Sequence, residues 1–208
     1  MRVKSLASAP DRAGRYRVVF EDDSVVRLYK QTVQDFGLYP GRDLCQEELH
    51  QLDIAAGEMS AKMRAVRIVS ASNVSKRDLE QRLIHKGEDP EHAKNAVRWM
   101  SELSLVDDAK TAEMVVSRCV AKGYGLARAK QELYEKRIPK EFWEDALAEY
   151  PDQSDKIMEY FKSKLHADAD QRDIKRAVDA LIRRGHSYGV IRRVLNELSL
   201  DREEFPEE

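Results

Sequence analysis

The sequence predicts a mainly α-helical protein of three tandem three-helix repeats in an elongated, curved array, with a small N-terminal β-hairpin extension. The composition favours this class, because 36% of the 208 residues are charged, 42% are hydrophobic, and only nine are glycine and six proline. Apolar positions recur at intervals of 50 and 48 residues, which indicates tandem helical units. Strand-forming residues are concentrated in a single segment, 15–29.

The repeat is read from three leucines, Leu83, Leu133 and Leu181. Apolar residues lie four positions before each leucine (Leu79, Ala129, Ala177) and fourteen positions after it (Val97, Leu147, Leu195). Four positions after each leucine, where a helix must turn, stand Gly87, Arg137 and Gly185.

These patterns divide the chain into five parts. They are an extension with a hairpin and a short helix from about Gln46 (1–57), three repeats (58–106, 107–151 and 152–198) and an acidic tail (199–208). The hairpin consists of two β-rich runs on either side of the turn-forming sequence "EDDS". Between the hairpin and the short helix, Gly37, Pro40 and Gly41 indicate turns.

Start and stop signals divide each repeat into three helices. Ser75 is placed to cap a helix, and Pro90 is placed at the first turn of the next one. Gly123 and Gly125 separate two helices of the second repeat, and Pro139 is expected to open its third.

The overall charge and the cysteine content exclude several classes of protein. A net charge of −2 does not fit permanent attachment to nucleic acid, so any basic surface must be local. Two cysteines outside any Cys-x-x-Cys motif favour a reduced, cytosolic chain. No signal peptide and no apolar stretch of about 20 residues is visible, so we expect a soluble, cytoplasmic protein with no membrane contact.

The segment "LVDDAKTAEMVVSRCVAKGYGLAR" contains three candidates for chemistry. Asp107 and Asp108 could form a catalytic pair, but adjacent residues of a helix diverge by about 100°, and a helix cap is the better interpretation. Cys119 lies on an apolar stripe, which favours a buried thiol over a nucleophile. Gly123 and Gly125 follow a helix rather than a strand, so they lack the context of a phosphate-binding loop.

The histidines are scattered, and no set with metal-ligand spacing surrounds any of them. They are His50, His85, His92, His166 and His186. Without a known catalytic signature either, we expect no enzyme activity, no metal and no cofactor.

Positive charge is concentrated in residues 170–193, where seven basic residues stand against three acidic ones. Arg172, Arg176 and Arg183 fall within about 40° on a helix, opposite its apolar face. This stripe is either a solvated face or an arginine-rich contact for acidic protein surfaces or DNA phosphate. The predicted partner-binding residues are Arg128, Lys136, Arg137, Arg172, Lys175, Arg176, Arg183, Arg184, Arg192 and Arg193.

Two further charged features have alternative interpretations. Arg128 either pairs with Glu132 one helical turn away or reaches a partner. The acidic tail either solubilises the protein as a disordered segment or folds back over the arginine stripe.

The central segment "LVDDAKTAEMVVSRCVAKGYGLARAKQELYEKRI" resembles the RecX family of regulators of the RecA recombinase. The residues that match the family pattern are Asp107, Asp108, Ala112, Gly123, Gly125, Arg128, Glu132, Leu133, Lys136 and Ile138. "SKRDLEQRLIHKG" and "RRGHSYGVIRRVL" resemble further family segments, so the resemblance covers residues 58–198. Thr111 departs from the family's usual aromatic residue, and Asp78 from its usual Glu.

The resemblance implies a non-enzymatic, monomeric protein that binds the groove of a RecA filament on single-stranded DNA. Such a protein restrains ATP hydrolysis, strand exchange and filament growth. Weak direct DNA contact is compatible with this function. Two rival functions remain from the residues alone. One is a helical nucleic-acid-binding module, whose binding would fall steeply with salt, and the other is a solenoid scaffold for an unrelated partner.

Overall fold

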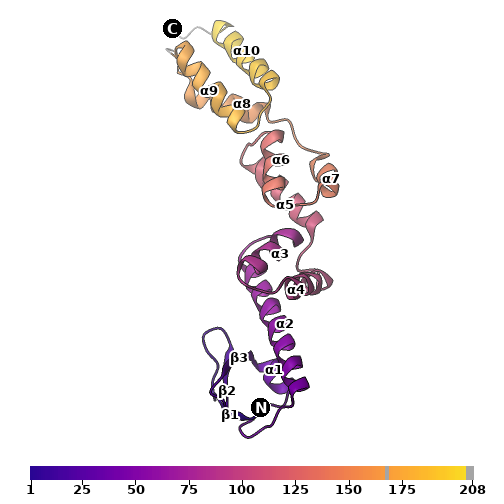
Figure 1. The fold of residues 1–208 in the computed structure, drawn as a ribbon. Coiled ribbons are helices and arrows are strands. Elements are labelled where there is room, and N and C mark those ends of the chain that lie inside the picture. Colours follow the sequence, from indigo (N-terminus) through magenta and orange to yellow (C-terminus); the bar gives the residue numbers. More distant parts are fainter. Residues whose placement is uncertain (167–168, 205–208) are drawn as a thin grey trace. The chain divides into compact units, whose positions relative to one another are not determined.

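The computed structural model describes residues 1–166 and 169–204, and it is mainly α-helical with a small N-terminal sheet (Figure 1). The predicted fold class is therefore confirmed. The chain divides into two compact units, Met1–Val106 and Asp107–Glu208.

The sheet of the first unit has three antiparallel strands in the order β1-β2-β3: β1 (Val3–Leu6), β2 (Arg15–Phe20) and β3 (Val25–Tyr29). The predicted hairpin is confirmed as β2 and β3, which pair Val18 with Val26. The prediction that only this segment forms strands is wrong, because β1 pairs with the free edge of β2. β1 has only four residues and relies on that neighbour for its hydrogen bonds, so its own sequence gives little strand signal.

Two helices follow the sheet, α1 (Lys30–Asp35) and α2 (Gln46–Ala71). The sequence analysis did not predict α1, and the turns that it placed at Gly37, Pro40 and Gly41 follow this helix. A capping box begins α2, since Cys45 Sγ accepts the Glu48 N–H at 3.4 Å and a Glu48 carboxylate oxygen accepts the Cys45 N–H at 2.8 Å.

The expected boundary between residues 57 and 58 lies inside α2, which is one 26-residue helix rather than two helices. Leu52 packs in the core beneath the sheet, whereas Ala61 and Ala65 pack in the core of the first repeat. At about 100° per residue, Leu52 and Ala61 lie on opposite faces of the helix. The apolar stripe therefore changes face midway along α2, which makes one helix resemble two in the sequence.

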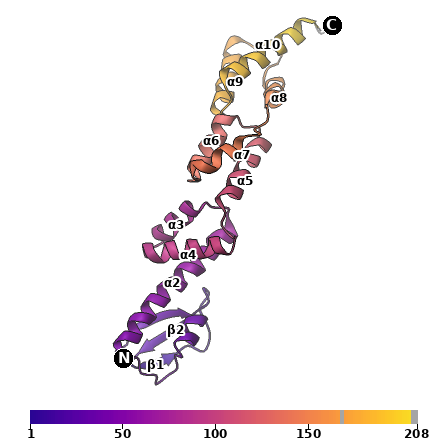
Figure 2. The same ribbon diagram turned by 90° about the vertical axis from the view of Figure 1, so that its right-hand side faces the viewer.

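The first repeat consists of the C-terminal half of α2 with α3 (Lys76–His85) and α4 (Pro90–Glu102) (Figures 1 and 2). The Ser75 hydroxyl accepts the Asp78 N–H at 3.1 Å, and Pro90 is the first residue of α4, as predicted. Leu79, Leu83 and Met100 are buried in the core that these helices enclose.

The second repeat, in the second unit, contains α5 (Asp108–Ala121), α6 (Leu126–Glu135), a 3-10 turn η1 (Lys140–Phe142) and α7 (Trp143–Leu147). Pro139 was expected to open one regular helix, but it precedes the 3-10 turn and the short α7 instead. The Trp143 indole N–H donates to the Ile138 carbonyl at 3.0 Å, which fixes this bend against the core.

The third repeat contains α8 (Ser154–Lys164), α9 (Gln171–Arg183) and α10 (Tyr188–Glu204) around Ile157, Phe161 and Ile191. Because α10 continues to Glu204, the expected tail boundary at residue 199 lies inside a helix. Residues 205–208 of the predicted acidic tail lie outside the described residues.

The leucine alignment is confirmed by a turn that occurs once in each repeat. Leu83, Leu133 and Leu181 are at most 1% exposed. The residue four positions later has a positive φ in each repeat: +87° at Gly87, +54° at Arg137 and +86° at Gly185. The N–H of the residue after it bonds back to the carbonyl of the leucine, which is the Schellman motif of a helix end.

Candidate binding surfaces

The two adjacent carboxylates at the start of α5 have separate structural environments. Asp107 is the N-cap, and its carboxylate accepts the Lys110 N–H at 3.1 Å. Asp108, the first residue of the helix, is only 5% exposed. The capping interpretation is therefore confirmed, and the pair does not face a common substrate position.

Cys119 lies in the core of the second repeat and is 3% exposed. Burial raises the pKa of its thiol, and the nearby Glu132 carboxylate raises it further. A thiol that is both covered and harder to ionise is a poor nucleophile. The structural interpretation of Cys119 is confirmed.

The Gly-x-Gly sequence forms a junction between the second and third repeats. Gly123 ends α5 with φ +64°, and Gly125 is the N-cap of α6. The Gly125 N–H donates to the Arg184 carbonyl at 2.9 Å, and a Cβ at Gly125 would overlap the Gly185 carbonyl. Gly125 must be glycine because the backbones of two repeats meet at this position. The Gly-x-Gly sequence is therefore a structural junction rather than a phosphate-binding loop.

Two side chains complete this junction. His186 is 8% exposed, and its Nε2 lies 3.0 Å from the Gly123 carbonyl oxygen. Burial lowers the pKa of this histidine, which favours the neutral ring. The Tyr150 hydroxyl donates to the Tyr124 carbonyl at 2.7 Å, and burial raises the pKa of Tyr150 to about 12.

The predicted arginine stripe is exposed on the third repeat, and from here on the name also covers Lys175 and Arg192. Arg172, Lys175, Arg176 and Arg183 lie on the solvent side of α9, and Arg192 lies on α10. Among the described residues, only Arg176 of these five has an ion-pair partner, Asp173 at 3.3 Å. Most of the stripe's positive charge is therefore available to a partner.

The remaining predicted residues have partners within the chain or constrained positions. Arg184 stacks on the Tyr160 ring at 4.6 Å, and Arg193 reaches Asp152 at 3.2 Å. Arg128 pairs with Glu132 at 2.5 Å, which supports the intrachain alternative for this residue. Lys136 is the C-cap of α6, and Arg137 follows it with a φ of +54°.

A second basic site lies in the first unit, and the sequence did not suggest it. Five cations line an open cleft of about 500 Å³ between the sheet, α2 and α3. They are Arg15, Arg64, Arg67, Arg82 and Lys86, hereafter the arginine cleft. The sequence does contain two basic pairs at helical spacing, Arg64 with Arg67 and Arg82 with Lys86, and each pair shares one helix face. Such pairs are also typical of a solvated helix face, so they did not indicate a site.

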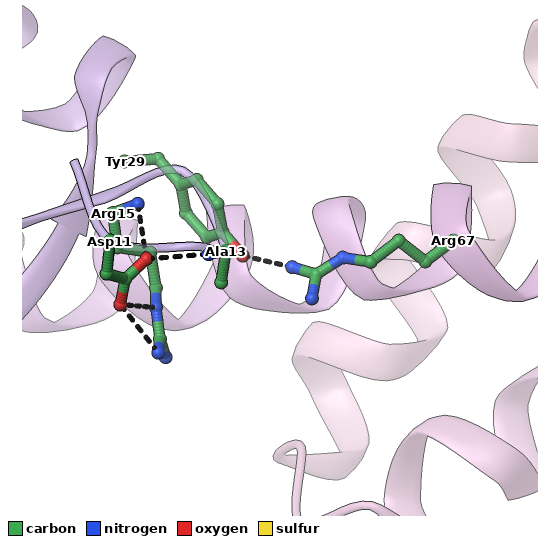
Figure 3. A network of polar contacts seen from close by, with 5 residues as sticks. All are labelled: Asp11, Ala13, Arg15, Tyr29 and Arg67. Atoms are coloured by element: carbon green, nitrogen blue, oxygen red, sulfur yellow. Dashed lines mark hydrogen bonds and ion pairs between the residues drawn. The ribbon is translucent and has the colours of Figure 1, made fainter.

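Hydrogen bonds hold the arginines of this cleft in place. In Figure 3, Asp11 forms two bonds to the Arg15 guanidinium, at 2.9 and 3.1 Å, and its other oxygen accepts the Ala13 and Arg15 N–H groups. The backbone bond from Arg15 is the main reason why the pKa of Asp11 is lowered. Opposite them, the Arg67 guanidinium donates to the Tyr29 hydroxyl (Figure 3), which links α2 to the sheet.

The described residues contain no cluster of three or more His, Cys, Asp or Glu side chains that could hold a metal ion. None of the described helices is long and apolar enough to cross a membrane. The fold and these surfaces define a tandem three-helix-repeat protein with two exposed basic sites.

Comparison with known proteins identifies the family. A family profile described as "RecX, second three-helix domain" matches residues 107–147, which carry α5 to α7. Regulatory protein RecX of Vibrio parahaemolyticus is 30% identical over 139 residues, covering 65% of this chain and 90% of its own. Regulatory protein RecX of Clostridioides difficile is 25% identical over 190 residues, covering 88% of this chain and 89% of its own. The chain belongs to the RecX family.

Two solved structures have the same fold. A crystal structure of regulatory protein RecX covers 94% of this chain and 98% of its own, with a TM-score of 0.66 and 17% identity. RecX from Lactobacillus salivarius covers 70% of this chain and 99% of its own, with a TM-score of 0.61 and 22% identity.

Proposed function

We propose that this protein is a non-enzymatic, cytoplasmic and monomeric regulator that binds the RecA filament on single-stranded DNA and restrains its ATP hydrolysis, strand exchange and growth. The observation that carries the proposal is the 30% identity to a relative named regulatory protein RecX, of which this chain covers 90%. The arginine stripe supports the same conclusion, because exposed charge that the chain itself does not neutralise steers association with an oppositely charged surface of a partner.

The tandem repeats also support a filament partner. Each repeat has its own core, so the chain presents a series of similar units, each able to contact one subunit of a polymer. Several linked contacts raise the affinity for a filament above that for a single RecA subunit, since each further contact forms at a high effective concentration.

The test is DNA-dependent ATP hydrolysis by the cognate RecA, titrated with this protein well below one molecule per RecA subunit. We expect suppression at these ratios, and we expect replacement of Arg176, Arg183 and Arg192 by Glu to weaken it at least tenfold in the concentration needed. No effect up to equimolar protein, together with no binding to preformed filaments, would overturn the proposal and leave a scaffold for another partner.

A matched control separates the stripe from bulk charge. Replacing Lys94, Arg98 and Arg118 by Glu makes the same charge change at exposed positions of α4 and α5. If the two triple variants lose suppression equally, net charge rather than the stripe carries the effect, and the stripe is not the contact surface.

A further inference from the structure

We propose that the arginine cleft binds the phosphodiester backbone of one nucleic-acid strand, without preference for its bases. This site lies in the first unit, apart from the predicted partner-binding residues, and its test needs no RecA. The inference therefore stands or falls independently of the proposed function.

The charge balance of the cleft leaves two cations for a ligand. Arg15 pairs with Asp11 at 2.9 Å, Arg64 with Glu88 at 2.6 Å and Arg82 with Asp78 at 2.8 Å. Arg67 and Lys86, in contrast, have no carboxylate within ion-pair distance among the residues described, so the cleft retains two positive charges. Each phosphodiester carries one negative charge, so two neighbouring phosphates would balance them.

Two of the acidic partners are buried and serve to position the arginines. The side chains of Glu88 and Asp78 are 7% and 9% exposed, so a ligand cannot easily replace them. The Ser60 hydroxyl donates to Glu88 at 3.0 Å, and Arg64 also donates to the Lys86 carbonyl at 2.9 Å. These bonds fix the guanidinium of Arg64 before any ligand arrives, which reduces the entropy lost on binding.

The arginines keep donors for a ligand after these internal bonds are made. Arg67 uses one N–H for the Tyr29 hydroxyl and one for the Met63 carbonyl at 3.2 Å. Arg82 donates one N–H to the Ser72 hydroxyl at 3.4 Å, and its other terminal nitrogen forms the ion pair with Asp78. A guanidinium has five N–H donors, so each of these two arginines has at least three left, arranged in the planar fork that matches phosphate oxygens.

The lining of the cleft selects phosphate over base. Besides the five cations, its polar side chains are the hydroxyls of Tyr29, Ser60 and Ser72, and the rest of the lining is Ala13, Ile68 and Ala71. No amide or carboxylate side chain lines it, and Tyr29 is 9% exposed and cannot stack with a base, so guanidinium groups are its main donors and they match the phosphate oxygens that every nucleotide carries. The cleft is open and has a volume of about 500 Å³, and the ligand that we propose is a single strand passing along it.

The experiment measures fluorescence anisotropy of a labelled oligothymidylate titrated with the full-length protein at several salt concentrations. The test variant is Arg67→Ala with Lys86→Ala, which removes the two cations without carboxylate partners. We expect at least tenfold weaker binding. We also expect the slope of log affinity against log salt to fall by about 1.4, since each phosphate contact on a single strand contributes about 0.7.

Matched controls make the result specific. Lys94→Ala with Arg98→Ala removes the same charge from exposed positions of α4 outside the cleft and should leave the affinity within about twofold. Replacing Arg67 also removes its hydrogen bond to Tyr29, which links α2 to the sheet. A second test variant, Lys86→Glu, changes only an exposed side chain and leaves this link intact. Wild-type affinity and slope in both cleft variants would overturn the proposal.

Two further arms identify the ligand. Oligoadenylate and oligothymidylate of equal length should bind within about threefold of each other, since base stacking and base edges are not read. Adenosine triphosphate should compete far more weakly than an oligonucleotide at equal phosphate concentration. Equal competition would show a free nucleotide site, and a strong base preference would show recognition that this cleft does not provide, so either result would refute the proposal.

Discussion

Replacing Gly125 with alanine adds one methyl group where the backbones of the second and third repeats meet. The new Cβ would overlap the carbonyl group of Gly185 and the backbone nitrogen of His186. Gly125 itself has φ −80°, which alanine adopts without strain, so the substitution tests only the space between the backbones. We expect the third repeat to shift away from α6.

The cost follows from the hydrogen bonds that this shift would break. They run from the Gly125 N–H to the Arg184 carbonyl (2.9 Å), from the Ala127 N–H to the Gly185 carbonyl (3.2 Å), and between His186 Nε2 and the Gly123 carbonyl (3.0 Å). At a net value of about 0.5–1.5 kcal/mol each, their loss destabilises the folded chain by about 1.5–4.5 kcal/mol. Alanine also restricts the unfolded chain, which offsets about 0.4–1 kcal/mol. We therefore expect the free energy of unfolding to fall by about 1–4 kcal/mol.

Urea unfolding followed by tryptophan fluorescence measures this change in the second unit. The chain has two tryptophans, so in a Trp99→Phe background Trp143 reports the second repeat alone. The matched control is Gly189→Ala, since a Cβ at this α10 position would meet no heavy atom within 4 Å. Faster amide exchange at Ala127 should accompany the loss of stability. Equal stability of the Gly125 and Gly189 variants would refute the steric argument.

Two further predictions concern the turns that end α6 and α9. Arg137 holds a φ of +54°, which costs a non-glycine residue about 1–2 kcal/mol. After the greater freedom of glycine in the unfolded chain is counted, Arg137→Gly should raise the free energy of unfolding by about 0.5–1 kcal/mol. The same urea titration measures this change, and a decrease would contradict the idea that Arg137 is strained. In the folded chain His186 has a pKa below its ordinary value of 6.5. As the pH falls, the unfolded chain therefore takes up a proton at this histidine before the folded chain does. The contribution of neutral His186 to stability is complete above pH 6.5 and is lost as the pH falls toward the folded pKa. Unfolding free energies measured between pH 5 and 7.5 should therefore decrease on acidification, and His186→Gln should flatten that dependence; an unchanged slope would show that other groups cause it.

The repeats could be predicted because their cores depend on local periodicity. Leu83, Leu133 and Leu181 are buried at equivalent positions, and the residues four positions later all adopt left-handed backbone. Each of these features follows from residues within one or two helical turns, where spacing determines which side chains meet. The division of α2 into two helices failed for the same reason, since its two halves pack in different cores and the local period breaks between them.

The candidate sites show which surfaces could be predicted from the sequence and which could not. The arginine stripe could be predicted because Arg172, Arg176 and Arg183 share one helix face. The arginine cleft could not be predicted, because Arg15 meets Arg67 and Arg82 only after β2, α2 and α3 have packed together. Arg15 precedes Arg67 by 52 residues and Arg82 by 67, and no spacing pattern relates positions so far apart in the chain, so the site emerges only from tertiary structure.

The buried residue that follows each left-handed turn explains how similar repeats acquire different contacts. Glu88, Ile138 and His186 occupy this position, are 9%, 4% and 8% exposed, and all donate their backbone N–H to the aligned leucine. The backbone motif requires a left-handed residue before this position, but it does not determine the side chain that is buried there. Ile138 packs into the core of its own repeat, Glu88 holds Arg64 in the arginine cleft, and His186 bonds the neighbouring repeat. One turn geometry therefore serves a core, the arginine cleft and a junction between repeats, and the three repeats differ in the single side chain that is buried after the turn.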